Sequence, residues 1–323
     1  MKFMSIHPSR SAFFAGYLLA VVVGQMAVAT AEDETAKSTT PNVKHMIDTH
    51  IHLYDTSREK GVPWPPKDDA VLYKPHLPDE FTKIAKASGV TGTVIVEASD
   101  WIEDNQWVLD LVEGDDFYVG LVGKLDLTDK QFKKHLKKLS QDKRIVGIRA
   151  RVAKSIDFTD EVVVKNVRAM ARRNLTLDIL PHGISVADCD TIARAVPDIR
   201  IVVNHCLAYA ADGEPVDLKW VDEVKKLAKN KNVYCKVSAL YQHSAVQPAP
   251  TDIGHYQSLL DVLWNAFGQE RLIYGSNWPV TKRSGDYASY VAVVNSFFSK
   301  KGKEARERYF WQNAAEAYQL DLK

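Results

Sequence analysis

Short apolar runs alternate with longer amphipathic stretches from Met46 to the end of the chain. The runs are rich in Val and Ile, and several are almost continuously apolar, as expected for parallel strands that are buried on both faces. They predict eight strands: Ile47–His52, Thr93–Ala98, Phe117–Val122, Ile145–Arg151, Leu175–Leu180, Ile199–His205, Val233–Ser238 and Arg271–Gly275.

Helical periodicity fills the seven intervals between these runs and the stretch after the last run, which holds two helices. The predicted helices are Pro78–Ser88, Ile102–Glu113, Asp129–Gln141, Asp160–Arg173, Val186–Ala195, Leu218–Lys229, Ile253–Phe267, Tyr287–Ser299 and Lys303–Tyr318. This alternation predicts an α/β protein with a single-domain (β/α)8 TIM barrel, which typically needs about 250 residues. An open doubly wound sheet is the alternative, but the glycine-rich phosphate loop that usually follows its first strand is missing from this sequence.

Two segments between the predicted elements are unusually long, residues 53–77 after the first strand and residues 239–252 after the seventh. Both follow the carboxyl end of a strand, and barrels of this kind build their active sites from the loops at that end. We therefore expect these two segments to form walls of a substrate site.

The N-terminus differs in composition from the rest of the chain. Lys2 and Arg10 precede the apolar stretch Ala12–Val23, and small residues follow up to Ala31. This order is typical of a secretory signal peptide, because about 12 apolar residues fall short of the roughly 20 that a spanning helix needs. We expect residues 1–31 to be the signal peptide, 32–45 a flexible linker and 46–323 the barrel domain. The protein is then periplasmic or secreted, without stable membrane insertion.

The composition is that of an ordinary globular protein, with 46% hydrophobic and 26% charged residues and a formal net charge of +1. A near-neutral chain is a poor partner for nucleic acid. A small-molecule substrate is the expected partner, and homo-oligomer formation stays open.

Of the three cysteines, Cys206 and Cys235 lie in or beside apolar runs, which predicts buried free thiols rather than a disulfide framework.

The first predicted strand contains the strongest candidate chemistry, the sequence IDTHIH at residues 47–52. Alternate residues of a strand point to the same side, so His50 and His52 can share one metal ion or one substrate. Two imidazoles inside an apolar run are costly unless they are paired or ligated. We assign both to a functional site, the alternative being two satisfied core histidines.

Other polar residues follow later strands. His182 comes after the fifth strand and His205 ends the sixth, whereas His243 lies in the loop after the seventh, from which it can reach a substrate. The remaining histidines fall in the N-terminus, loops or helices and are expected to be solvated. The eighth strand ends in the sequence GSNWP, which includes Asn277 and Trp278 and indicates either close backbone approach at a site or a simple turn.

Basic residues also lie within the predicted strands. Arg149 and Arg151 share one face of the fourth strand, and Lys236 lies inside the seventh. A cation inside a barrel is costly unless it meets an anion. A substrate carboxylate is one such anion, which arginine suits bidentately, and a structural ion pair with Glu97 or Asp178 is the other interpretation.

Six segments, taken in order, resemble the amidohydrolase superfamily: IDTHIH, GVTGTVIVEAS, RIVGIRARV, IRIVVNHC, NVYCKVSAL and ERLIYGSNWPV. The similarity is to the amidohydrolase-related branch of TIM-barrel hydrolases, which includes lactonases, and it covers about residues 46–319. It implies that His50 and His52 bind a divalent metal or, in metal-free members, the substrate. It also implies that His182 and His205 are the histidines of strands five and six.

The sequence departs from this family at Asn277, where the family has an Asp that binds metal and takes a proton from the attacking water. A neutral amide cannot act as a general base and is a weaker ligand. Either another group is the base, with His182, His205 or Glu97 in reach, or the chain works without metal, or it binds without hydrolysis. The fourth strand also lacks a lysine able to bridge two metals, so at most one divalent ion, with Zn²⁺ preferred, is expected.

These features predict a hydrolase that acts on a small carboxylated or sugar-derived lactone or ester. The predicted residues divide by role into metal ligands (His50, His52), catalytic groups (His182, His205, Asn277) and substrate-binding groups (Glu97, Arg149, Lys236, Trp278). A decarboxylase of an aromatic carboxylic acid and a non-catalytic binding protein are the alternative functions.

Overall fold

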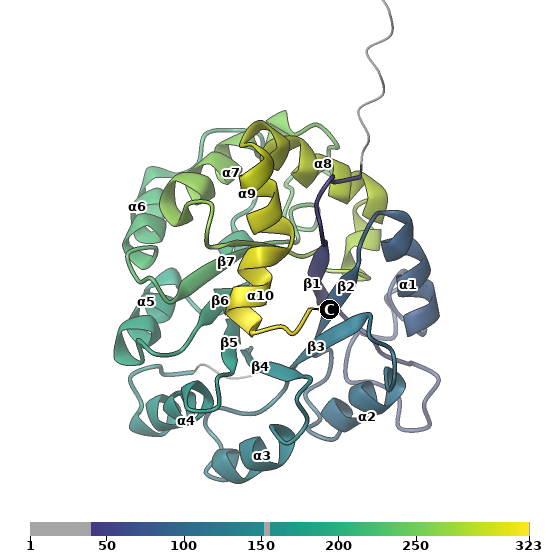
Figure 1. The fold of residues 1–323 in the computed structure, drawn as a ribbon, viewed down its shortest axis with the longest axis vertical. Helices are drawn as coiled ribbons and strands as arrows, with labels where there is room; N and C mark the ends of the chain where they lie inside the picture. The colour runs from purple at the N-terminus through teal and green to yellow at the C-terminus, as the bar shows by residue number, and fades with distance from the viewer. Residues whose placement is uncertain (1–39, 152–155, 323) are drawn as a thin grey trace, which may run out of the picture. The chain divides into compact units, whose positions relative to one another are not determined.

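The computed structural model describes residues 40–151 and 156–322. Within these residues, eight parallel strands follow one another around a single sheet (Figure 1). They are β1 (Ile47–Ile51), β2 (Gly92–Val96), β3 (Tyr118–Gly123), β4 (Ile145–Ala150), β5 (Thr176–Ile179), β6 (Ile201–Val203), β7 (Val233–Val237) and β8 (Leu272–Tyr274). All eight were predicted from the apolar runs, with ends that differ by two residues or fewer.

Helices occupy the predicted intervals between the strands and the predicted stretch after β8. They are α1 (Pro78–Ala87), α2 (Asp104–Leu111), α3 (Phe132–Leu139), α4 (Glu161–Ala171), α5 (Val186–Ala195), α6 (Leu218–Leu227), α7 (Gly254–Phe267) and α8 (Tyr287–Lys300). The last predicted helix consists of α9 (Lys303–Glu307), a π-helical turn (Arg308–Gln312) and α10 (Asn313–Tyr318). Among the described residues, no helix has the length and apolar character needed to cross a membrane.

The sheet closes where β8 returns to β1. Ile51 forms a parallel bridge with Trp278, and the backbone N–H of His52 donates to the carbonyl of Trp278 at 2.8 Å. The N–H of Asn277 donates to the carbonyl of His50, also at 2.8 Å. The predicted (β/α)8 barrel is therefore confirmed, and its closure lies immediately beside the candidate site residues.

Helix α10 covers one end of the barrel, in front of the strands in Figure 1. Ala314, Ala317 and Tyr318 pack in one apolar cluster with strand residues, including Ile47 at the start of β1 and Ile273 of β8. Arg200, just before β6, donates to the carbonyl of Ala317, and Asn313 donates to that of Leu272 at the start of β8. The amino ends of the strands are thereby closed off. A substrate must enter at the opposite end, where the carboxyl ends of the strands and their loops lie.

The N-terminal predictions fall mostly outside the described residues. The signal peptide and residues 32–39 of the linker are not among them. Residues 40–45 follow the barrel surface, because the N–H of Lys44 donates to the Glu307 carboxylate at 3.3 Å and the ring of His45 lies 5.1 Å from that of Trp311. The three cysteines are buried free thiols, as expected for Cys206 and Cys235 from their apolar surroundings.

Candidate active site

Sharp backbone turns end three of the strands that carry site residues. His205 after β6, Ala239 after β7 and Asn277 after β8 all have positive φ angles, of 55°, 56° and 63°. Such conformations are costly for residues other than glycine and tend to cluster at functional sites. At Gly275, an added Cβ would lie only 2.8 Å from the Cβ of His50, so glycine is needed for the close approach predicted from the GSNWP sequence.

Five histidine rings form a row across the carboxyl end of the barrel. The distances between successive ring centroids are 5.0 Å for His52–His50, 4.4 Å for His50–His205, 6.1 Å for His205–His243 and 5.4 Å for His243–His182. Burial lowers the pKa of all five below the usual 6.5, to about 3 for His52 and about 4 for His243. The row therefore consists of neutral imidazoles at pH 7.

A cavity of about 360 Å³ opens beside this row. Both long loops contribute to its wall, as expected, with Trp64 from residues 53–77 and Gln242 and His243 from residues 239–252. The other polar lining residues come from strand ends and the turn after β8: His52, Glu97, Arg149, Arg151, His182, His205, Asn277, Arg283 and Ser284. The volume lies in the range of small-molecule sites.

Two arginines flank the one buried carboxylate in this wall. Glu97 Oε1 lies 3.6 Å from Arg149 and 3.5 Å from Arg151, which also pairs with Asp100 at 2.9 Å. Burial raises the pKa of Glu97. Neither oxygen of Glu97 nor Nε of Arg149 has a hydrogen-bond partner within the described parts of the chain, so these groups retain capacity for a substrate.

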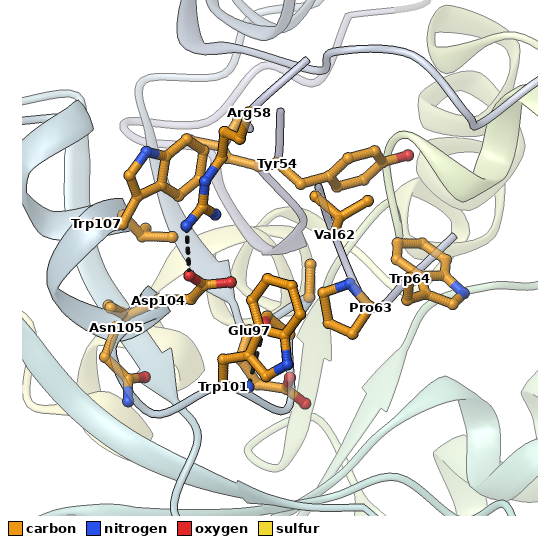
Figure 2. Close-up of a pocket in the computed structure, with 15 residues that line it drawn as sticks. Tyr54, Arg58, Val62, Pro63, Trp64, Glu97, Trp101, Asp104, Asn105 and Trp107 are labelled. Atoms are coloured by element: carbon orange, nitrogen blue, oxygen red, sulfur yellow. Dashed lines mark hydrogen bonds and ion pairs between the residues drawn. The ribbon is translucent and has the colours of Figure 1, made fainter. Parts of the chain in front are cut away.

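A narrower pocket of about 20 Å³ adjoins the cavity and shares Trp64 and Glu97 with it (Figure 2). Arg58 pairs there with Asp104 at 2.8 Å and lies over the ring of Trp107. This volume is about that of a single water. The pocket is too small for a substrate, and its residues instead support the loop that carries Trp64.

Lys236 and Trp278 do not line the cavity. Lys236 has no exposed surface and forms an ion pair with Asp178 at 3.0 Å, the structural interpretation left open by the sequence. Trp278 lies beneath the site against Phe81 and His76, at ring distances of 5.0 and 5.2 Å. The expectation that His76 is solvated was wrong, because its ring is fully buried in this aromatic cluster.

Sequence reasoning missed four polar or aromatic residues of the wall, Trp64, Gln242, Arg283 and Ser284. Trp64 packs 5.7 Å from the ring of His52, and Arg283 forms an ion pair with Asp69. The only available signal was their location in loops that follow β1, β7 and β8. His243, noted only as able to reach a substrate, proves to belong to the histidine row.

The surroundings of His50 and His52 fit a divalent metal poorly. Nδ1 of His52 donates to the Val96 carbonyl at 2.9 Å, which leaves Nε2 as the acceptor and is by itself compatible with a metal, but the His52 side chain is also hydrogen-bonded to Asn277. Nδ1 of His50 lies 3.5 Å from Nζ of Lys236. No group of three or more His, Cys, Asp or Glu in the described chain is arranged to hold a metal ion. The two histidines are brought together as predicted, but with a buried cation and an amide around them instead of a carboxylate ligand.

Comparisons with known proteins agree with the fold and the family resemblance. A family model described as amidohydrolase matches residues 47–320. An L-fucono-1,5-lactonase from Burkholderia ambifaria is 28% identical and aligns over 85% of this chain and 96% of its own.

Two solved structures share the fold. An amidohydrolase from Burkholderia multivorans with bound zinc has a TM-score of 0.75 at 21% identity, covering 86% of this chain and 100% of its own. A probable 2-pyrone-4,6-dicarboxylic acid hydrolase from Acinetobacter baumannii with bound citric acid has a TM-score of 0.65 at 19% identity, covering 85% and 99%.

Proposed function

We propose that this chain, which belongs to the amidohydrolase family, hydrolyses the ring ester of small sugar-derived or carboxylated lactones. The observation that carries the proposal is the row of neutral histidines beside Arg149 in a cavity of small-molecule size. The relationship to a protein named L-fucono-1,5-lactonase over nearly its whole length supports a lactone as the substrate class.

His182 is the proposed general base. Among the histidines that line the cavity it is the least buried. Its ring lies 5.4 Å from that of His243. It takes a proton from the attacking water and returns it to the ring oxygen when the carbon–oxygen bond breaks, so the proton is conserved over the cycle. His205, from the end of the neighbouring strand β6, and Asn277, from the end of β8, position the water.

Arg149 is the proposed stabiliser of the developing oxyanion. Its guanidinium is buried, lines the cavity and retains an unpaired Nε, so it can donate to the lactone carbonyl oxygen as negative charge develops there. Arg151 and Glu97 complete the polar wall, where they can bind substrate hydroxyl or carboxylate groups. These steps use only residues of the chain, because the surroundings of His50 and His52 do not suit a metal.

A panel of lactones tests the proposal. Purified protein is mixed with L-fucono-1,5-lactone, other neutral aldonolactones and carboxylated lactones, and acid release is followed before and after chelation and with added zinc or manganese. We expect at least one lactone to be opened, with loss of turnover in Arg149→Met. Carbon dioxide release from an aromatic carboxylate without lactone opening would instead identify a decarboxylase.

The Asn277→Asp variant separates an enzyme from a binding protein. Lactone binding without turnover in the natural chain, together with hydrolysis gained by Asn277→Asp, would replace the proposal with a binding function.

We also propose that the chain is exported after cleavage of residues 1–31. N-terminal sequencing of the mature protein and fractionation of the producing cell test this, and an uncleaved cytoplasmic product would contradict it.

A further inference from the structure

A buried cation beneath the cavity is left unused by the proposed reaction. Nζ of Lys236 lies 2.9 Å from the Thr49 carbonyl, 3.0 Å from the Asp178 carboxylate and 3.5 Å from Nδ1 of His50. We propose that Lys236 is a positioning residue that holds His50 in the tautomer with its hydrogen on Nε2. The first-strand pair then presents a hydrogen-bond donor instead of two metal-ligating lone pairs.

The charge of Lys236 is maintained by the network around Asp178. This carboxylate also accepts hydrogen bonds from Tyr318 at 2.8 Å and from Asn204 at 3.0 Å. Burial lowers the pKa of Lys236 from its usual 10.5, and the adjacent carboxylate opposes that change. Two fully buried and mutually paired charges are much less costly than either alone, so the lysine remains an ammonium group.

An ammonium group determines which nitrogen of His50 carries the hydrogen. It has three hydrogens and no lone pair, and the Thr49 carbonyl and Asp178 take two of the hydrogens. The third faces Nδ1 of His50, where an N–H group would be repelled and a lone pair is attracted. His52 has the opposite arrangement, because its Nδ1 donates to the Val96 carbonyl and leaves its other nitrogen as the acceptor.

The consequence is a donor kept ready beside the cavity. The ring of His50 lies between those of His52 and His205, both of which line the cavity, and its Nε2 has no partner among the residues that the structure describes. Buried polar atoms are nearly always paired, so an unpaired donor here points to a group that arrives with the substrate. A metal would need the lone pair of Nε2, which this tautomer lacks.

Nitrogen NMR tests the tautomer directly. Protein labelled with ¹⁵N in histidine is measured at pH 8, with the His50 and His52 signals assigned from His50→Gln and His52→Gln. The expected spectrum has the unprotonated nitrogen at Nδ1 in His50 and at Nε2 in His52, which serves as an internal reference. A His50 ring protonated at Nδ1, like His52, would overturn the inference.

A paired substitution tests the role of Lys236. The double variant Lys236→Met/Asp178→Asn removes both charges, so no lone charge is buried, and His50 should then lose its fixed tautomer. Zinc affinity, measured by calorimetry on metal-free protein, should rise by about tenfold or more, the usual scale of effects from groups that contact a ligand. The surface pair changed in Lys301→Met/Asp261→Asn, with its 3.2 Å contact, is the matched control and should alter neither readout.

Equal zinc affinity in the natural chain and the double variant, with zinc shifting the His50 Nε2 signal in both, would show that Lys236 does not act in this way. If the double variant fails to fold, the spectrum of the natural chain still decides the tautomer. These readouts need no turnover, so the inference stands or falls independently of the lactone as substrate.

Discussion

Replacing Lys236 should show how strongly the buried ion pair stabilises the barrel. In Lys236→Met the side chain keeps nearly the same length, so little cavity forms, but the Asp178 carboxylate loses its ion-pair partner while remaining fully buried. Hydrogen bonds from Tyr318 and Asn204 remain. Breaking a buried pair in this way typically costs about 3–5 kcal/mol.

The single variant Asp178→Asn should cost a similar amount, because it leaves the ammonium buried without a counter-charge. The double variant should lie within about 2 kcal/mol of the natural protein, since replacing both charges by neutral groups is often close to neutral. The two single effects should therefore be strongly non-additive, with a coupling of at least about 3 kcal/mol.

Urea unfolding followed by tryptophan fluorescence measures these free energies, and thermal melts give a second readout. At about 2–4 °C per kcal/mol for a large domain, each single variant should melt about 6–20 °C below the natural protein. Additive single effects, or a cost below about 1 kcal/mol for Lys236→Met, would refute the argument that the two groups are charged and paired.

Four further predictions concern the cavity. His182→Asn should lower kcat by about 10²–10⁴-fold with unchanged folding, whereas the control His135→Asn on the outer helix α3 should leave kcat unchanged. Because burial lowers the pKa of His182, the acid limb of the kcat/KM profile of the natural protein should lie below pH 6.5. Arg149→Met should lower kcat/KM by about 10²–10³-fold, and an unchanged rate would remove it from the mechanism. Chelation followed by metal analysis should leave turnover intact, and loss of activity restored by zinc would contradict the assignment of every step to protein groups. A carboxyl whose pKa is raised by folding binds its proton more tightly in the folded state. The contribution of Glu97 to the free energy of unfolding should therefore fall as pH rises above 4.5. Urea unfolding of Glu97→Gln at several pH values should lack this dependence.

The sequence by itself determined the barrel and the end at which its site lies. Strands buried on both faces must be apolar almost throughout, so their runs stand out from the helical periodicity, and the order of runs then leaves few topologies. Because the carboxyl ends of all eight strands meet at one face, His50, His52, His182, His205 and Asn277 could be placed together from their positions at strand ends.

Only the tertiary structure decided which charged residues face a substrate. Arg149 and Lys236 are both cations within strands, yet Arg149 reaches the cavity whereas Lys236 lies below it beside Asp178. Depth along a tilted strand and the choice of partner depend on how neighbouring strands are staggered, which local sequence does not encode. The same holds for Trp64 and Arg283, whose positions depend on the paths of long loops. These neighbours, and not the histidines themselves, decide whether His50 is a metal ligand or a hydrogen-bond donor.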